Sequence, residues 1–209
     1  MNFKFGDRIL FFGDSITDCH RDRHRADCLG RGYALMASAR LQQLYPDLQL
    51  EFINRGISGD RTSDLLRRLQ TDCLDLEPDQ VILFVGINDC TNYFYHQQLA
   101  VEEAVEEFKD NYRNILCPIL DSGASLSLME PFVLPYPSDR YQWRTFLNPM
   151  NQSIRQLARE YKLTYVPLDG HLNALGIAGD FNRYTQGDGV HPTPLGHLEI
   201  ADQLLRYIR

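Results

Sequence analysis

Two uninterrupted apolar runs, each followed by a glycine, limit the folds open to this chain more than any other feature. Residues 9–12 and 81–85 contain no polar side chain, and Gly13 and Gly86 follow them. A strand without a polar face must be buried on both sides, as it is in the centre of a parallel sheet. We therefore predict two neighbouring central strands, the first of which leads directly into Gly13-Asp14-Ser15.

Three further strands are expected at residues 50–53, 126–129 and 164–168, and the first and last of these alternate as edge strands do. Apolar residues at helical spacing predict helices at residues 33–44, 65–73, 101–116, 150–161 and 194–208. Pro149 is expected to begin or kink the fourth helix, and residues 169–189 to form a long connection. Strands that alternate with helices predict an α/β protein with a five-stranded parallel sheet, in the order 2-1-3-4-5.

Length and charge restrict the class of protein. At 209 residues, 44% of them hydrophobic, the chain suits one domain over residues 1–209. Its net charge of -7 would repel nucleic acid or an anionic membrane, so we expect a small-molecule partner, and a homo-oligomer is compatible with this. Five cysteines without regular spacing, no secretory signal and no long apolar run predict a cytoplasmic protein with free thiols and no membrane span.

Reactive side chains gather in the loops expected at one edge of the sheet. Ser15 follows the first strand, and Asp188 and His191 precede the last helix. A serine hydroxyl becomes nucleophilic when a base removes its proton, and histidine, with an ordinary pKa of about 6.5, suits this task. Asp188 can hold the imidazole in the required tautomer. We predict Ser15, His191 and Asp188 as a catalytic triad.

Attack of a serine on an ester creates an oxyanion, which needs hydrogen-bond donors directed at it. We predict three donors: the backbone N–H groups of Ser15 and Gly59 and the side-chain amide of Asn88. Asp14 and Asp89 are expected to support the turn and Asn88, respectively. An alternative role for Asp14, as the nucleophile of an Asp-x-Asp phosphatase, is disfavoured because Ile16 occupies the second aspartate position.

Four short blocks of sequence contain these residues: Gly13-Asp14-Ser15, the Gly59 segment at residues 57–60, Gly86-Ile87-Asn88-Asp89, and Asp188-Gly189-Val190-His191-Pro192. In kind and order they resemble the four blocks of the SGNH (GDSL-type) hydrolases. The resemblance implies a flavodoxin-like three-layer α/β/α sandwich, a serine esterase or acylhydrolase that forms an acyl-enzyme, and no cofactor. Ile16 stands where the family motif has leucine, a substitution that conserves volume.

Within that family, residues 54–59, 86–89 and 129–132 are similar to bacterial carbohydrate acetylesterases of the intracellular acetylxylan-esterase type. Unlike them, the chain has no tryptophan just before Asp188 or just after Asp89. The resemblance implies removal of short acyl groups, acetyl above all, from a carbohydrate or other small ester. Two alternatives are a lysophospholipase or acyl-thioesterase acting on longer chains, and a non-catalytic ligand-binding module on the same fold.

Other histidines and cysteines offer competing interpretations. His171 lacks an acid three residues before it, and His197 lies within the last helix, so neither is preferred as the base. A metal cluster at Cys19, His20, His24 and Cys28 is disfavoured because interleaved arginines would repel a cation, and no metal is expected. Those arginines could hold an anionic substrate group or simply lie in a solvated loop.

Aromatic residues lie in two segments near the expected strand ends. Tyr93, Phe94 and Tyr95 follow the Asn88 block, and residues 132–143 include further aromatic side chains. They could line an acyl or sugar pocket, belong to the core, or form a subunit contact. The sequence leaves these interpretations open.

Overall fold

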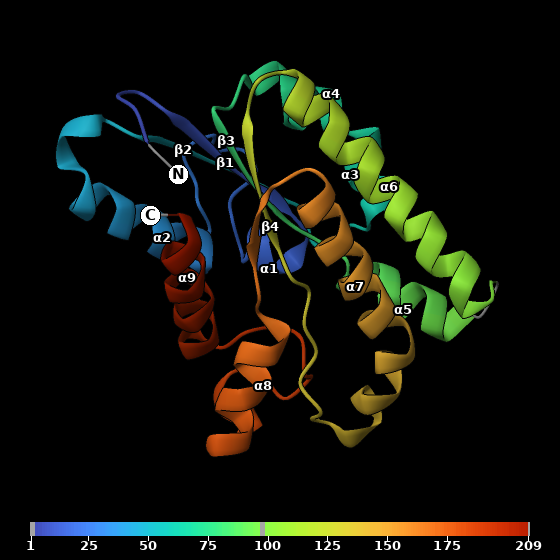
Figure 1. Ribbon diagram of the computed structural model, residues 1–209. Coiled ribbons are helices and arrows are strands. Elements are labelled where there is room, and N and C mark those ends of the chain that lie inside the picture. The colour runs from blue at the N-terminus through green and yellow to red at the C-terminus, as the bar shows by residue number, and fades with distance from the viewer. Residues whose placement is uncertain (1–2, 97–98, 209) are drawn as a thin grey trace.

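Five parallel strands form the sheet at the centre of the protein, in the order β2-β1-β3-β4-β5 (Figure 1). The computed structural model describes residues 3–96 and 99–208. The strands are β1 (Arg8–Gly13), β2 (Glu51–Gly56), β3 (Gln80–Phe84), β4 (Ser125–Met129) and β5 (Thr164–Val166). The predicted α/β class and strand order are confirmed, with β5 ending two residues earlier than expected.

The two apolar runs form the centre of the sheet. β1 and β3 pair in parallel, so that Phe11 lies opposite Ile82. Every residue of β3 is buried, and in β1 every residue after Arg8 is buried. β2 alternates in burial over its last residues because it lies at the edge. The absence of a polar face in these two runs is therefore a consequence of burial between two layers of helices.

Helices cover both faces of the sheet. Figure 1 shows α2 and α9 on one side, where they pack against each other, and α3, α6 and α7 on the other. The α-helices are α1 (Ser15–Asp18), α2 (Tyr33–Leu44), α3 (Thr62–Arg67), α4 (Leu69–Asp72), α5 (Ile87–His96), α6 (Val101–Asp121), α7 (Arg144–Glu160), α8 (Asp169–Ala178) and α9 (Pro194–Ile208). Short 3-10 turns are η1 (Pro46–Leu48), η2 (Leu74–Leu76), η3 (Ser138–Trp143) and η4 (Phe181–Arg183). This is the three-layer α/β/α sandwich.

The helices depart from the sequence expectations in several places. The stretch expected as a connection contains α8, in which Gly176 packs so closely on Phe181 that a Cβ would lie 2.1 Å from its ring. Local composition could not reveal this contact. α5, not predicted, begins directly after Gly86 and buries Ile87, Cys90 and Tyr93, a spacing that could have indicated it.

Two other predicted helices have different bounds. The helix expected over residues 65–73 is divided at Arg68 into α3 and α4. α7 begins at Arg144, so that Pro149 lies inside it. None of the helices in the described part of the chain combines the length and apolarity needed to cross a bilayer.

Candidate active site

Ser15 is the first residue of α1, directly after the end of β1. Asp14 caps this helix, since its carboxylate accepts a hydrogen bond from the N–H of Ile16 at 3.0 Å. Only glycine fits at position 13, where a Cβ would lie 2.2 Å from the carbonyl oxygen of Phe84. The close approach of β1 to β3 and the cap together bring the serine to the carboxyl edge of the sheet, where open α/β sheets place their ligands.

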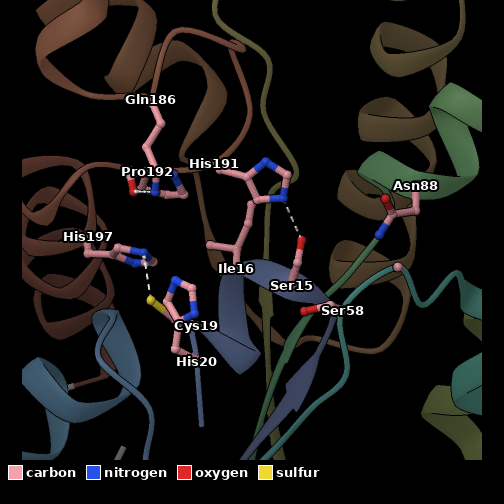
Figure 2. Close-up of a pocket in the computed structure, with 11 residues that line it drawn as sticks. Ser15, Ile16, Cys19, His20, Ser58, Asn88, Gln186, His191, Pro192 and His197 are labelled. Atoms are coloured by element: carbon pink, nitrogen blue, oxygen red, sulfur yellow. Dashed lines mark hydrogen bonds between the residues drawn. The ribbon is translucent and has the colours of Figure 1, made fainter.

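A continuous chain of hydrogen bonds links a hydroxyl, an imidazole and a carboxylate at this edge. The Oγ of Ser15 lies 3.1 Å from Nε2 of His191 (Figure 2). Nδ1 of His191 lies 2.6 Å from Oδ2 of Asp188. The other carboxylate oxygen, Oδ1, accepts the backbone N–H groups of Val190 and His191, each at 2.9 Å. Because Asp188 accepts from Nδ1, the neutral imidazole leaves Nε2 free to accept the serine proton.

The carboxylate and imidazole shift each other's pKa in opposite directions. Burial alone would raise the pKa of Asp188, but hydrogen bonds from His191 and from two backbone N–H groups lower it to about 2. The hydrogen bond that His191 donates to Asp188 raises the pKa of His191 above its ordinary value, against partial burial. Asp188 is therefore ionised at neutral pH, and His191 titrates above its usual range.

A pocket of about 450 Å³ lies beside the serine, and the residues around it come from separate loops. Ser15, Gly59, Asn88 and His191 all line it. The backbone at Gly59 has a φ of +88°, a conformation that favours glycine. Nδ2 of Asn88 donates one of its two protons to the carbonyl oxygen of Asp60, at an N–O distance of 3.0 Å. The second proton is available to a ligand.

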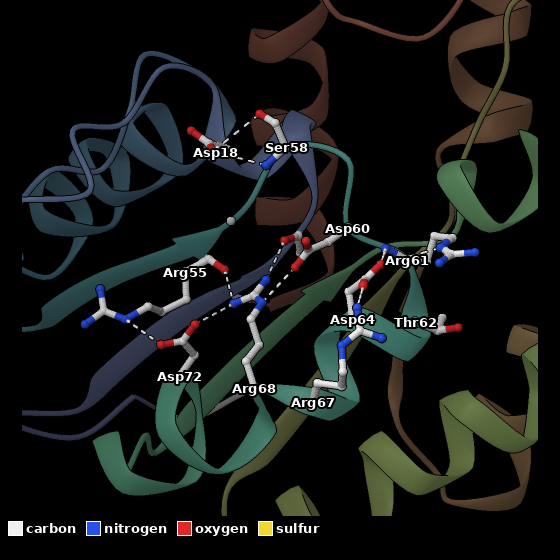
Figure 3. Close-up of polar contacts among 12 residues, drawn as sticks. Asp18, Arg55, Ser58, Asp60, Arg61, Thr62, Asp64, Arg67, Arg68 and Asp72 are labelled. Carbon is white, nitrogen blue, oxygen red and sulfur yellow. Dashed lines mark hydrogen bonds and ion pairs between the residues drawn. The ribbon is translucent and has the colours of Figure 1, made fainter. Parts of the chain in front are cut away.

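A partly buried arginine holds the loop that follows Gly59. Nε of Arg68 donates to the carboxylate of Asp60 at 2.7 Å, and its terminal nitrogens donate to the backbone oxygens of Gly13 at 3.1 Å and Arg55 at 2.8 Å (Figure 3). The guanidinium also lies 4.6 Å from the centre of the Phe12 ring. The same side chain thus joins the ends of β1 and β2 to the Gly59 loop.

Asp18 at the end of α1 makes a second connection to this loop. Its Oδ2 accepts the backbone N–H of Ser58 at 3.2 Å and a hydrogen bond from Arg23 at 2.6 Å. Sequence reasoning missed both Asp18 and Arg68, because the bonds to Ser58 and Gly13 that tie them to the site span 40 and 55 positions of the chain. Local spacing carries no signal for such contacts.

The two supporting aspartates are buried. Asp89 accepts the N–H of Thr62 at 3.1 Å and its hydroxyl at 2.5 Å, which ties the start of α3 to α5. Burial raises the pKa of Asp14 to about 7 and that of Asp89 to about 7, despite hydrogen bonds that lower both. The bonds of Asp89 to Thr62 hold the backbone beside Asn88 in place. The bond of Asp14 to the N–H of Ile16 holds the backbone beside Ser15.

The other two histidines considered as bases have different partners. His197 lines the pocket, but its Nδ1 accepts the N–H of Tyr33 at 3.2 Å and its Nε2 lies 3.2 Å from the sulfur of Cys19 (Figure 2). Burial lowers the pKa of His197 to about 4, so it remains neutral at physiological pH. His171 lies 3.3 Å from Glu199. In the structure, only His191 of these three contacts Ser15 within the described residues.

Comparison with known proteins places the chain in a family. Residues 11–198 match the model of the GDSL-like lipase/acylhydrolase family. The chain belongs to this family. This GDSL-family protein is a carboxylic-ester hydrolase. The match therefore includes the serine loop, the histidine loop and the sheet from Phe11 onward.

Named relatives of this GDSL-family hydrolase are esterases. It is 29% identical to an acetylxylan esterase of Geobacillus stearothermophilus over 100% of this chain and 96% of that protein. It is 26% identical to an arylesterase of Vibrio mimicus over 84% of this chain and 82% of the relative. A protein described as a GDSL-like lipase from Parabacteroides merdae superposes with a TM-score of 0.90 at 31% identity, covering 98% of this chain and 96% of its own.

The solved structures also include the Geobacillus esterase and its variants. The esterase itself superposes with a TM-score of 0.87 at 28% identity, over 99% of this chain and 95% of its own. Its catalytic mutants carry alanine in place of a serine, an aspartate or a histidine, and the last two lie three positions apart. Another variant replaces a tryptophan directly before that aspartate, whereas this GDSL-family hydrolase has Gly187 directly before Asp188.

Proposed function

We propose that this protein removes short acyl groups, acetyl in particular, from a carbohydrate or other small ester through an acyl-enzyme on Ser15. The observation that carries the proposal is the unbroken chain from the Ser15 hydroxyl through His191 to Asp188, beside the pocket that Gly59 and Asn88 line. The catalytic mutants of the Geobacillus esterase, at a serine, an aspartate and a histidine, support the same assignment of roles.

In the proposed reaction, His191 Nε2 takes the proton of Ser15 as Oγ attacks the ester carbonyl carbon. The oxyanion of the tetrahedral intermediate is held by the N–H groups of Ser15 and Gly59 and by the free amide proton of Asn88. His191 then gives its proton to the departing alcohol. Water attacks the acyl-enzyme with His191 as base, which releases the carboxylic acid and restores the serine.

Asp188 orients the imidazole and stabilises the imidazolium that forms in each step. Its depressed pKa keeps it ionised throughout, so that it does not take up the proton itself. We propose a cytoplasmic location, which is supported by the five free cysteines, Cys19, Cys28, Cys73, Cys90 and Cys117.

Replacement of the nucleophile tests the proposal directly. Ser15→Ala should reduce hydrolysis of 4-nitrophenyl acetate by on the order of 10⁶-fold, the effect of removing the nucleophile from a serine protease. The unfolding temperature should change little. A fluorophosphonate should add to wild-type protein at Ser15 and leave the variant unmodified in mass spectrometry. Ser138→Ala, at an exposed serine outside the pocket, serves as the control. Substantial turnover by Ser15→Ala would refute the proposed mechanism.

A further inference from the structure

Gly59 and Asn88 lie between two pockets. On one side is the pocket with Ser15 and His191. On the other is a shallower pocket of about 270 Å³, which the same two residues share with Arg61, Thr91, Asn92, Tyr95 and His96. A substrate whose carbonyl oxygen lies against Gly59 and Asn88 is therefore adjacent to both. The second pocket is slightly below the range of about 300–1,000 Å³ for drug-sized ligands, a size that suits one sugar ring.

The lining of the second pocket is polar, and part of it has no partner. The side chain of Asn92 makes no hydrogen bond to any residue in 3–96 or 99–208. The Nε of Arg61 lies 3.5 Å from Asp64, and its terminal nitrogens donate no hydrogen bond within those same ranges. An acyl chain placed here would separate these groups from water without replacing their hydrogen bonds. The hydroxyl groups of a sugar would instead form hydrogen bonds with Asn92 and Arg61.

Tyr95 presents an aromatic surface at the same pocket. It is 60% exposed, whereas Tyr93 two residues before it is 8% exposed and belongs to the core. The ring of Tyr95 makes T-shaped contacts with Phe94 at 5.2 Å and Trp143 at 5.9 Å. These contacts fix the ring before any ligand binds, so that binding costs little side-chain entropy. A fixed, exposed ring beside free amide and guanidinium groups matches the apolar face and the hydroxyl edge of a pyranose.

We propose that this second pocket, lined by Gly59, Arg61, Asn88, Thr91, Asn92 and Tyr95, is the subsite for the sugar ring of an acetylated carbohydrate. Tyr95 stacks on the apolar face of the ring, and Arg61 and Asn92 bind its hydroxyl groups. The inference rests on the proposed function and names its substrate class. It also gives a role to three of these aromatic residues, since Tyr93 lies in the core, Trp143 supports Tyr95, and Tyr95 contacts the ligand.

Steady-state kinetics with two acetyl esters test the subsite. Tyr95→Ala should raise KM for an acetylated methyl pyranoside about tenfold, whereas kcat/KM for ethyl acetate, which has no ring, should stay within about twofold. Tyr95→Phe keeps the ring and should retain the wild-type KM. The matched control is Tyr207→Ala, at a half-exposed tyrosine on α9, which should leave the kinetic constants for both esters unchanged. Equal losses on both esters, or no loss on the sugar, would overturn the subsite.

A binding measurement separates this inference from the catalytic proposal. Trp143 is the only tryptophan in the sequence and contacts Tyr95, so its fluorescence should report occupation of the pocket. In the Ser15→Ala background, the acetylated pyranoside should change the emission with a Kd that Tyr95→Ala and Asn92→Ala each weaken about tenfold. Unchanged affinity in both variants would refute the subsite. Normal binding without hydrolysis by the wild-type protein would refute the proposed function alone.

Discussion

Arg68 donates through Nε to the carboxylate of Asp60, and the backbone oxygen of Asp60 in turn accepts the side-chain amide of Asn88. The same guanidinium bonds the carbonyl of Gly13, two residues before Ser15. One partly buried cation therefore joins the nucleophile turn to two of the proposed oxyanion donors. These bonds hold the turn of Ser15 and the donors at Gly59 and Asn88 in fixed positions relative to one another. Electrostatic stabilisation of a transition state depends on donors that are fixed in this way before the reaction.

Loss of this cation should lower kcat more than it raises KM. Arg68→Met keeps a stem that packs on Phe12 but removes the bonds to Asp60 and Gly13, and we expect kcat for 4-nitrophenyl acetate to fall about 100-fold. The neighbouring Arg67 is mostly exposed and pairs only with Asp64 within the described chain, so Arg67→Met is the matched control. Partial recovery of Arg68→Ala by added guanidinium would support positioning. An unchanged kcat in Arg68→Met would contradict it.

The pH dependence of activity follows from His191. The hydrogen bond that His191 donates to Asp188 raises the pKa of His191, and the proposed base works only when neutral. The value of kcat/KM should therefore fall as pH decreases through a midpoint above about 6.5. Asp188→Asn removes the charge that raises this pKa and should move the midpoint to lower pH, while kcat falls about 10⁴-fold. The measurement is kcat/KM from pH 5 to 9. A flat profile in the wild type would exclude His191 as the base.

Stability should fall as pH rises, because of Asp14. Burial raises the pKa of Asp14 to about 7, whereas in the unfolded chain it is about 3.9. Between these values the folded protein holds a proton that the unfolded chain has lost, so each increase in pH favours unfolding. The stabilisation is complete below pH of about 4 and is lost as pH rises through about 7.

Asp14→Asn tests this linkage because asparagine can still accept from the N–H of Ile16. The variant should gain unfolding temperature relative to the wild type more at pH 8 than at pH 5, as measured by calorimetry. Asp121→Asn, at an exposed position at the end of α6, is the control for removal of one negative charge. A difference from the wild type that does not change with pH would show that Asp14 does not titrate as described.

Two glycines provide a matched test of packing at the serine turn. In Gly13→Ala the new Cβ would lie 2.2 Å from the oxygen of Phe84, and we expect a loss of about 1–3 kcal/mol in the free energy of unfolding, with lowered kcat. Gly170, in the first turn of α8, has no atom within 4 Å of such a Cβ. Gly170→Ala should be stabilised by about 0.5–1 kcal/mol in urea unfolding. Equal effects in both would refute the packing argument.

The sheet and the reactive groups at its edge could be predicted from local sequence. An apolar run such as residues 81–85 cannot be stable at a surface, so its burial and central position follow from the run itself. Ser15, His191 and Asp188 were likewise recognisable, because a serine after a buried strand and an aspartate three residues before a histidine are local patterns. Neither pattern specifies a distance between the hydroxyl and the imidazole.

Only the tertiary structure decided which distant side chains meet. It brought Ser15 and His191, 176 positions apart, to 3.1 Å, and it directed the nitrogens of His197 to Tyr33 and Cys19 instead. It also buried Tyr93 and exposed Tyr95, although the two lie in the same short segment. The physical reason is that side-chain partners depend on how strands and helices pack against one another, whereas a local pattern determines only which face of its own element each residue occupies.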